Sequence, residues 1–123
     1  MPDHPIRLRG GWELLPPDAP PSRVTLPITW PADTPRRFQL VRQFGRPPLA
    51  VNERIAFRFE DVPGLISAHL NGIPLDIGDV PGGSIPLVEP LPARNVLILD
   101  VDRDAVLPVH PWGTIALMVG PGE

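Results

Sequence analysis

Three aspartates lie at alternate positions near the end of an apolar run, at Asp100, Asp102 and Asp104. If an extended strand continues through them, all three carboxylates lie on one face of that strand and repel one another. A hard cation such as Ca²⁺ would relieve the repulsion, because it prefers carboxylate oxygens as ligands. The spacing lacks the glycine and the distal glutamate of an EF-hand loop, so the alternative is a solvated strand end neutralised by Arg103 or by an arginine of a neighbouring strand. A structural Ca²⁺ is therefore the one metal that the sequence suggests.

The three tryptophans are the best candidates for binding a carbohydrate, because an aromatic ring offers a rigid apolar face with a polar edge. Trp12 fits core packing. Trp30 and Trp112 lie at boundaries between extended segments and loops, where a ring is either exposed to a ligand or packed structurally. Arg42 alternates with apolar residues, so its charge needs an internal ion pair or a place at one end of the fold. Its guanidinium is the third candidate for a sugar contact.

The chain shows no set of residues that supports catalysis. It has no cysteine, and His4, His69 and His110 are scattered. No serine, histidine and aspartate occur with the glycine pattern of a nucleophile elbow. Glycoside hydrolysis needs a matched pair of carboxylates, and no such pair stands out among the 14 acidic residues. We therefore expect a protein that is not an enzyme and that has no cofactor beyond that Ca²⁺.

The composition limits the class of protein. A chain of 123 residues predicts one domain spanning residues 1–123. Its net charge of −3 argues against nucleic acid and anionic membranes as partners. No apolar run approaches the roughly 20 residues that cross a bilayer, and the first residues lack the apolar segment of a signal peptide. These features predict a cytoplasmic protein.

Short stretches of alternating apolar and polar residues recur between the 20 prolines and 11 glycines of the chain. Alternation with a period of two predicts strands, with Ile66, Ala68 and Leu70 sharing the apolar face of one of them. Asn71-Gly72 predicts a hairpin turn, because both residues tolerate a positive φ. The predicted strands are residues 6–8, 12–15, 38–44, 54–60, 66–70, 73–77, 97–101 and 115–119, with a further extended segment at residues 24–30. About eight short strands at this spacing are typical of a β-sandwich or barrel.

Six short motifs follow one another in an order known from one family of domains. They are Gly11-Trp12, residues 26–30 (LPITW), residues 40–44 (LVRQF) with Pro47, residues 54–62 (RIAFRFEDV), residues 70–72 (LNG), and Leu91 with residues 95–101 (NVLILDV). Over about residues 8–120 the chain resembles the N-terminal sugar-binding domain of glycoside hydrolase family 2, the family of β-galactosidases and β-glucuronidases. It departs from that family at Leu40, where members usually carry an aromatic residue.

The resemblance implies an all-β fold, the galactose-binding-domain-like jelly-roll β-sandwich of about eight strands. The catalytic carboxylates of the family belong to a separate barrel domain, for which 123 residues leave no room. The resemblance therefore implies a stand-alone, non-catalytic module.

Two functions are left open at this stage. The first is a carbohydrate-binding module that uses Trp30, Trp112 and Arg42. The second is a protein-interaction or structural module that forms a homo-oligomer or docks on a partner protein, with no sugar ligand. Apolar residues opposite the main apolar faces favour the second function; they are Val41, Ala56, Val96 and Ile98.

Overall fold

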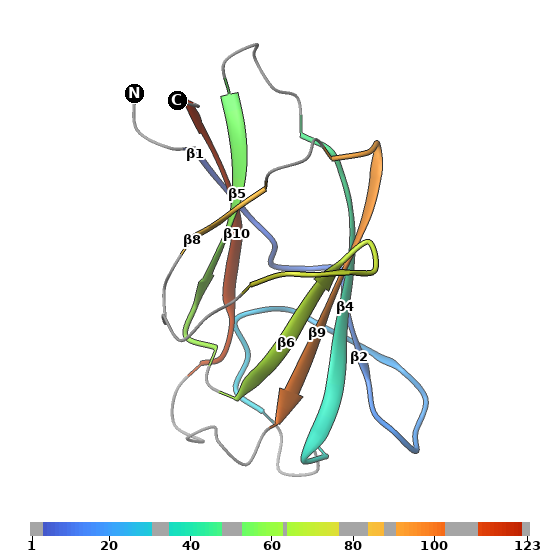
Figure 1. The fold of residues 1–123 in the computed structure, drawn as a ribbon. Helices are drawn as coiled ribbons and strands as arrows, with labels where there is room; N and C mark the ends of the chain where they lie inside the picture. The colour runs from blue at the N-terminus through green and yellow to red at the C-terminus, as the bar shows by residue number, and fades with distance from the viewer. Residues whose placement is uncertain are drawn as a thin grey trace.

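The computed structural model of the chain describes residues 4–30, 35–47, 53–62, 64–76, 84–87, 91–102 and 111–121 (Figure 1). The described residues form ten β-strands and no helix. The strands are β1 (His4–Arg7), β2 (Trp12–Leu15), β3 (Ser22–Val24), β4 (Arg37–Gly45), β5 (Glu53–Glu60), β6 (Leu65–Leu70), β7 (Ile73–Pro74), β8 (Ser84–Pro86), β9 (Arg94–Asp102) and β10 (Thr114–Pro121). In this part of the chain no helix has the length and apolarity needed to cross a membrane.

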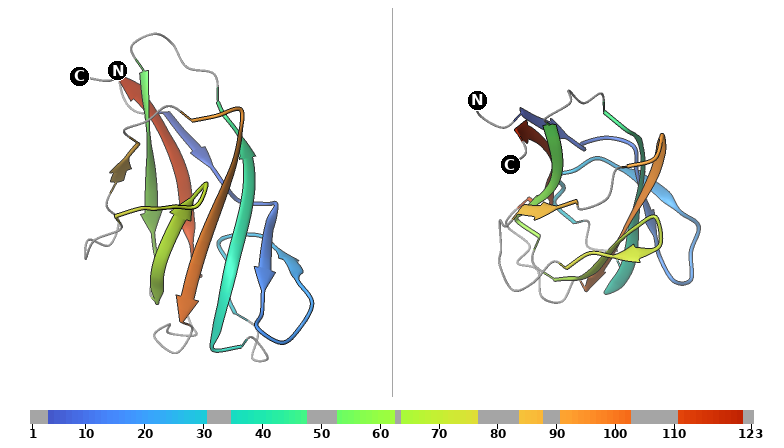
Figure 2. Two further views of the ribbon diagram at one scale, coloured as in Figure 1. Left: turned by 45° about the vertical axis from the view of Figure 1, so that its right-hand side comes forward. Right: turned by 45° about the horizontal axis from the view of Figure 1, so that its top comes forward.

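The strands form two antiparallel sheets that pack face to face, as the right-hand view of Figure 2 makes clear. The smaller sheet has the order β1-β10-β5-β8, and the larger sheet has the order β3-β2-β4-β9-β6-β7. The centre of the larger sheet is the β4–β9 pair, in register from Arg37↔Asp102 to Gly45↔Arg94. The predicted all-β jelly-roll sandwich is therefore confirmed.

The core lies between the sheets and follows from strand alternation. In β9 each second residue from Asn95 to Val101 is buried, and the facing β5 buries Ile55, Phe57 and Phe59. Trp12 is fully buried, as predicted, and its indole N–H donates to the carbonyl oxygen of Leu8 at 2.7 Å. Each buried aliphatic or phenylalanine side chain among them contributes about 1.5–3 kcal/mol through removal of apolar surface from water. The core is thus built from the two inward faces, as in other β-sandwiches.

Short strands with prolines form three of the four edges of the sheets. The edge strands β1, β7 and β8 have 4, 2 and 3 residues and contain Pro5, Pro74 and Pro86. Proline has no backbone N–H to offer a further strand. Brief, proline-bearing edges therefore oppose edge-to-edge aggregation.

The predicted Asn71-Gly72 turn is confirmed, with positive φ angles of 53° and 82°. The Asn71 side chain anchors the turn to β9, because its amide oxygen accepts from Val96 N at 2.9 Å. Its amide nitrogen donates to Asn95 Oδ1 at 3.0 Å. The return strand β7 is shorter than residues 73–77, since pairing with β6 covers Ile73–Pro74 and Ile77 lies outside the described residues.

Two of the short strands differ from the sequence-based expectation. β3 covers Ser22–Val24 instead of running on to residue 30, and Ile28 forms only an isolated bridge with Trp112. β8 was not predicted, because three residues ending in a proline are too few to display alternation. β3 pairs with the preceding strand β2, whereas β8 pairs with β5, about 30 residues earlier in the chain.

The prediction that Ile66 faces the core is wrong. Ile66 is 48% exposed, because a β-bulge interrupts the pairing of β6 with β9 between Leu65 and Ser67. Leu65 pairs with Val101 and packs against the core in its place. An extra residue in one strand reverses which side chains point inward.

Candidate functional site

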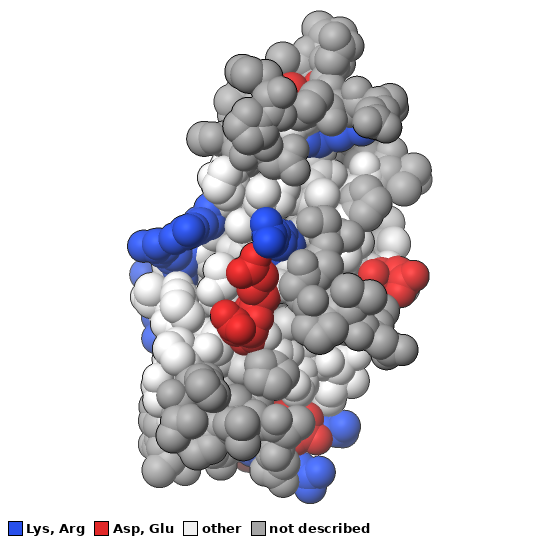
Figure 3. All heavy atoms as spheres, turned by 90° about the vertical axis from the view of Figure 1, so that its left-hand side faces the viewer, with Lys and Arg blue, Asp and Glu red and all other residues white. Residues whose placement is uncertain are grey.

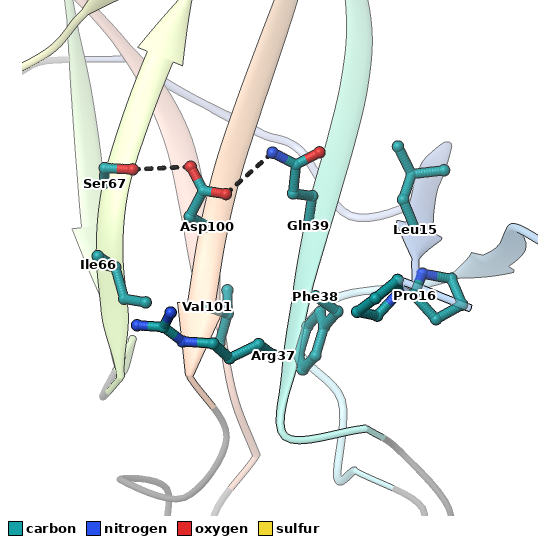
Figure 4. Close-up of a pocket in the computed structure, with 10 residues that line it drawn as sticks. Leu15, Pro16, Arg37, Phe38, Gln39, Ile66, Ser67, Asp100 and Val101 are labelled. Atoms are coloured by element: carbon teal, nitrogen blue, oxygen red, sulfur yellow. Dashed lines mark hydrogen bonds between the residues drawn. The ribbon is translucent and has the colours of Figure 1, made fainter. Parts of the chain in front are cut away.

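An open groove of about 540 Å³ lies on the outward face of the larger sheet (Figure 4). Its volume falls within the range of roughly 300–1,000 Å³ that is usual for small-molecule sites. The groove is formed by β4, β6, β9 and the residues at and after the end of β2. Its lining residues are Leu15, Pro16, Pro17, Arg37, Phe38, Gln39, Ile66, Ser67, Asp100 and Val101.

A row of three polar side chains crosses the groove on neighbouring strands. Gln39 pairs with Asp100 in the β4–β9 register, and Ser67 pairs with the same aspartate in the β6–β9 register. Gln39 Nε2 donates to Asp100 Oδ1 at 2.9 Å, and Ser67 Oγ donates to Asp100 Oδ2 at 2.7 Å. Figure 4 shows the carboxylate held between the two donors. Both of its oxygens are therefore fixed in orientation, and we call this set the polar row.

Apolar side chains flank the polar row. Figure 4 shows Ile66 on the β6 side, while Leu15 and Pro16 lie on the opposite side, at the end of β2. Phe38 lies beneath them and is only 4% exposed. The groove thus combines apolar walls with a few convergent polar groups, which is the usual composition of a ligand site.

Two of the three aspartates proposed as calcium ligands, Asp100 and Asp102, are engaged by protein donors. Asp100 and Asp102 share the outward face of β9, as alternation predicts. The carboxylate of Asp102 lies 3.3 Å from Arg36 Nε and 3.9 Å from Arg37 Nε, so neutralisation by an arginine of the neighbouring strand is confirmed. Among the described residues no three His, Cys, Asp or Glu side chains form a metal-binding group. Asp104 lies outside the described residues, and the Ca²⁺ site stays a prediction.

Trp30 and Trp112 come together in an aromatic cluster, and neither of them lines the groove. Their ring centroids are 5.4 Å apart, and Trp30 also packs edge-on against Phe38 at 4.8 Å. Trp112 is fully buried, so the expectation that its ring faces a sugar is wrong. The cause is the pairing of its backbone with Ile28, which draws the ring into the core. Trp30 is partly buried, and its role in sugar binding stays a prediction.

Arg42 lies on the inward side of β4, opposite Trp12 and Leu97 in the neighbouring strands. Its Nη1 donates to the carbonyl oxygen of Gln43, while its buried Nε has no hydrogen-bond partner in the described part of the chain. Among these residues no carboxylate forms an ion pair with Arg42, so the predicted internal ion pair is not observed there. Its contact with a sugar stays a prediction.

The backbone at Gly11 gives room to the Arg42 guanidinium. Gly11 has a φ of +79°, and a Cβ atom there would lie 3.1 Å from Arg42 Nε. Gly11→Ala should therefore lower the free energy of unfolding by about 1–2 kcal/mol, as expected for a side chain forced into the left-handed region. Gly10→Ala is the matched control, because nothing lies within 4 Å of its added Cβ. Urea denaturation measures the free energy of unfolding of both variants. Equal values for Gly11→Ala and Gly10→Ala would contradict the strain expected at Gly11.

The smaller sheet presents a different outward face. Figure 3 views the molecule from that side, where acidic and basic residues lie next to one another. Arg58 and Glu60 form an ion pair on β5, and Arg54 is exposed on the same strand. Exposed pairs of this kind contribute little to stability.

Sequence reasoning missed two of the three members of the polar row. Gln39 and Ser67 both face outward on their strands. Nothing in either segment indicates that they meet the same aspartate. The cross-strand register joins them, and that register becomes visible only when β4, β6 and β9 are aligned.

Sequence comparison finds no match to a family model or to a curated protein. Comparison of folds does find matches, and they agree with the fold predicted from the motifs. The chain has the fold of a sandwich domain present in enzymes of glycoside hydrolase family 2.

Three solved structures represent these matches. A chain assigned as a β-galactosidase from Bacteroides fragilis aligns with 98% of this chain at a TM-score of 0.69 and 19% identity. An FMN-binding β-glucuronidase from Facaelibacterium prausnitzii L2-6 aligns with 97% at a TM-score of 0.71 and 18% identity. A GH2 β-galacturonidase from Eisenbergiella tayi, bound to glycerol, aligns with 96% at a TM-score of 0.59 and 14% identity.

The matches concern one part of much longer enzymes. This chain covers 24%, 23% and 24% of those three chains, which fits an N-terminal domain alone. Identities this low establish the shared fold and leave the function to be argued from the site.

Proposed function

We propose that the chain is a non-catalytic carbohydrate-binding module and that its ligand lies in the outward groove. The observation that carries the proposal is the polar row of Gln39, Asp100 and Ser67 between apolar walls. The shared fold with three sugar-processing enzymes adds support.

The groove suits the two kinds of surface that a sugar presents. Hydroxyl groups at the edge of a sugar ring need hydrogen-bond partners, and the C–H groups of its face need apolar contact. Neighbouring strands lie about 4.8 Å apart, so the row presents polar groups over about 10 Å across three strands. Ile66 and Leu15 offer apolar contact on either side.

A non-catalytic role follows from the number of carboxylates. Hydrolysis of a glycosidic bond uses two carboxyl groups that flank the bond, and Asp100 is the only carboxylate among the residues that line the groove. The nearby Asp102 is engaged by Arg36 and Arg37. The groove therefore has the chemistry to hold a sugar but lacks an acid and base pair to cleave it.

The second candidate function is a protein-interaction module, which would form a homo-oligomer or bind a partner protein. The exposed apolar side chains of Ile66 and Ile73, at 48% and 60% exposure, favour it. Val41 and Ile98, predicted to face outward, are adjacent in the β4–β9 register and partly buried. Amide shifts at Ile73 that depend on protein concentration, with no response to sugar at the groove, would favour this role.

Replacing Gln39 tests the carbohydrate proposal. We expect millimolar neutral monosaccharides to shift the amide resonances of Gln39, Ile66 and Ser67 in two-dimensional NMR spectra. Gln39→Ala should weaken binding about two- to tenfold, since one hydrogen bond contributes about 0.5–1.5 kcal/mol. Gln43→Ala is the matched control, because Gln43 is also exposed on β4 but does not line the groove.

The sugar affinity of Gln39→Ala is compared with that of the control variant Gln43→Ala. Binding that weakens in Gln39→Ala and stays unchanged in Gln43→Ala supports the groove as the site. A full panel of monosaccharides that shifts no groove resonance in the folded protein would refute the proposal.

A further inference from the structure

We infer that Asp100 makes the groove selective for neutral sugars over acidic ones, an inference that rests on the proposed carbohydrate function. Two features of the polar row support this inference. Most of its donor hydrogens are already bonded to Asp100, and the negative charge of Asp100 is not in an ion pair with any described residue. Asp100 acts here as a specificity-determining residue.

The donors of the polar row point inward along the row. Ser67 has one hydroxyl hydrogen and gives it to Asp100 Oδ2, and Gln39 gives one of its two amide hydrogens to Asp100 Oδ1. The remaining capacity consists of acceptor lone pairs on Ser67, on Asp100 and on the Gln39 carbonyl oxygen, with a single free amide hydrogen. A row rich in acceptors recognises groups that donate, and sugar hydroxyls do so.

The negative charge on the polar row also favours a neutral ligand. Among the described residues, Arg37 is the cationic side chain that lines the groove, and the Asp102 carboxylate lies 3.9 Å from Arg37 Nε. That carboxylate also pairs with Arg36 at 3.3 Å, so one carboxylate is shared by two arginines and Arg37 keeps part of its positive charge. Asp100 receives only neutral donors from the described residues, so the polar row itself carries a negative charge that is not in an ion pair.

An acidic sugar therefore meets two obstacles at this row. Its carboxylate brings acceptors and no hydrogen to donate, and its negative charge faces that of Asp100. A neutral sugar that carries a hydroxymethyl group in the same position avoids both. The contrast between the two ligands isolates the contribution of Asp100.

Matched sugar pairs test the inference. The probes are methyl glucoside with methyl glucuronide, and methyl galactoside with methyl galacturonide, titrated at pH 7 and followed by the groove amide resonances. We expect the neutral member of at least one pair to bind five- to tenfold more tightly than its acidic counterpart. Asp100→Asn removes the charge and should bring that ratio below about twofold.

Glu13→Gln is the control for net charge. Glu13 is exposed on β2 of the larger sheet and does not line the groove, so this variant should keep the wild-type ratio. A measurement on the wild-type chain avoids dependence on the folding of the Asp100 variant. In 1 M NaCl, where the screening length falls to about 3 Å, the preference for the neutral sugar should shrink.

The outcomes separate the two proposals. Equal binding of both members of each pair at the groove, or a ratio that neither Asp100→Asn nor salt changes, overturns the selectivity and leaves the carbohydrate function standing. Absence of groove shifts with all four sugars overturns both.

Discussion

Replacing Trp112 by alanine should lower the free energy of unfolding by about 3–5 kcal/mol, the usual cost of truncating a buried tryptophan. The side chain is fully buried and its ring lies 5.4 Å from that of Trp30. Its backbone is tied to Ile28 by two hydrogen bonds of 2.9 and 2.7 Å. Removing the indole leaves a cavity at the end of the sandwich. Chemical denaturation followed by circular dichroism measures the loss.

An exposed apolar residue provides the comparison for Trp112. Ile73→Ala removes a side chain that is 60% exposed, and surface substitutions of this kind usually change stability by less than about 0.5 kcal/mol. A Trp112→Ala protein as stable as the Ile73→Ala protein would show that the indole is not a core residue.

Much of the fold was predictable because alternation is a local property. The bounds of β2 match the predicted residues 12–15, and in β9 and β10 the inward residues are those that the period-two pattern selects. The turn at Asn71-Gly72 follows from residue types that accept a positive φ. β8 could not be predicted in this way, since its three residues are a strand only by virtue of their pairing with β5.

The candidate site was less predictable because it depends on register. Asp100 was singled out from the sequence for its charge and spacing, but as a metal ligand. Its partners Gln39 and Ser67 lie 61 and 33 residues away in the chain, and no local pattern connects them. Trp112 was misassigned for a related reason, since its burial follows from a bridge to Ile28, 84 positions earlier.

The β-bulge in β6 explains both the wrong prediction for Ile66 and the shape of the groove. It places Leu65 opposite Val101 and Ser67 opposite Asp100, so Ile66 is left over between them. Ile66 therefore becomes an apolar wall of the groove, while Ser67 reaches the polar row. A regular strand would have buried Ile66 and removed that wall. Bulges often re-aim side chains next to functional sites.

Asn95 forms the polar link in the core and its removal should be costly. It is 2% exposed, and its amide nitrogen donates to the carbonyl oxygens of Pro92 at 3.1 Å and Phe44 at 3.5 Å. Its Oδ1 accepts from Asn71 Nδ2 at 3.0 Å. Asn95→Ala would remove all three hydrogen bonds, which lie in buried or partly buried surroundings. We expect it to lower the free energy of unfolding by about 2–3 kcal/mol.

Two further variants separate the contributions to this loss. Arg94→Ala changes the exposed neighbour in β9 and should alter stability by less than about 0.5 kcal/mol. Asn71→Gly keeps a residue that tolerates the φ of 53° but removes the side-chain bond to Asn95. Because the two asparagines share that bond, the double variant should lose at least about 0.5 kcal/mol less than the sum of the single losses. Additive losses in urea denaturation would mean that the link between the hairpin and β9 contributes nothing to stability, and that Asn95 acts only through the carbonyl groups it satisfies.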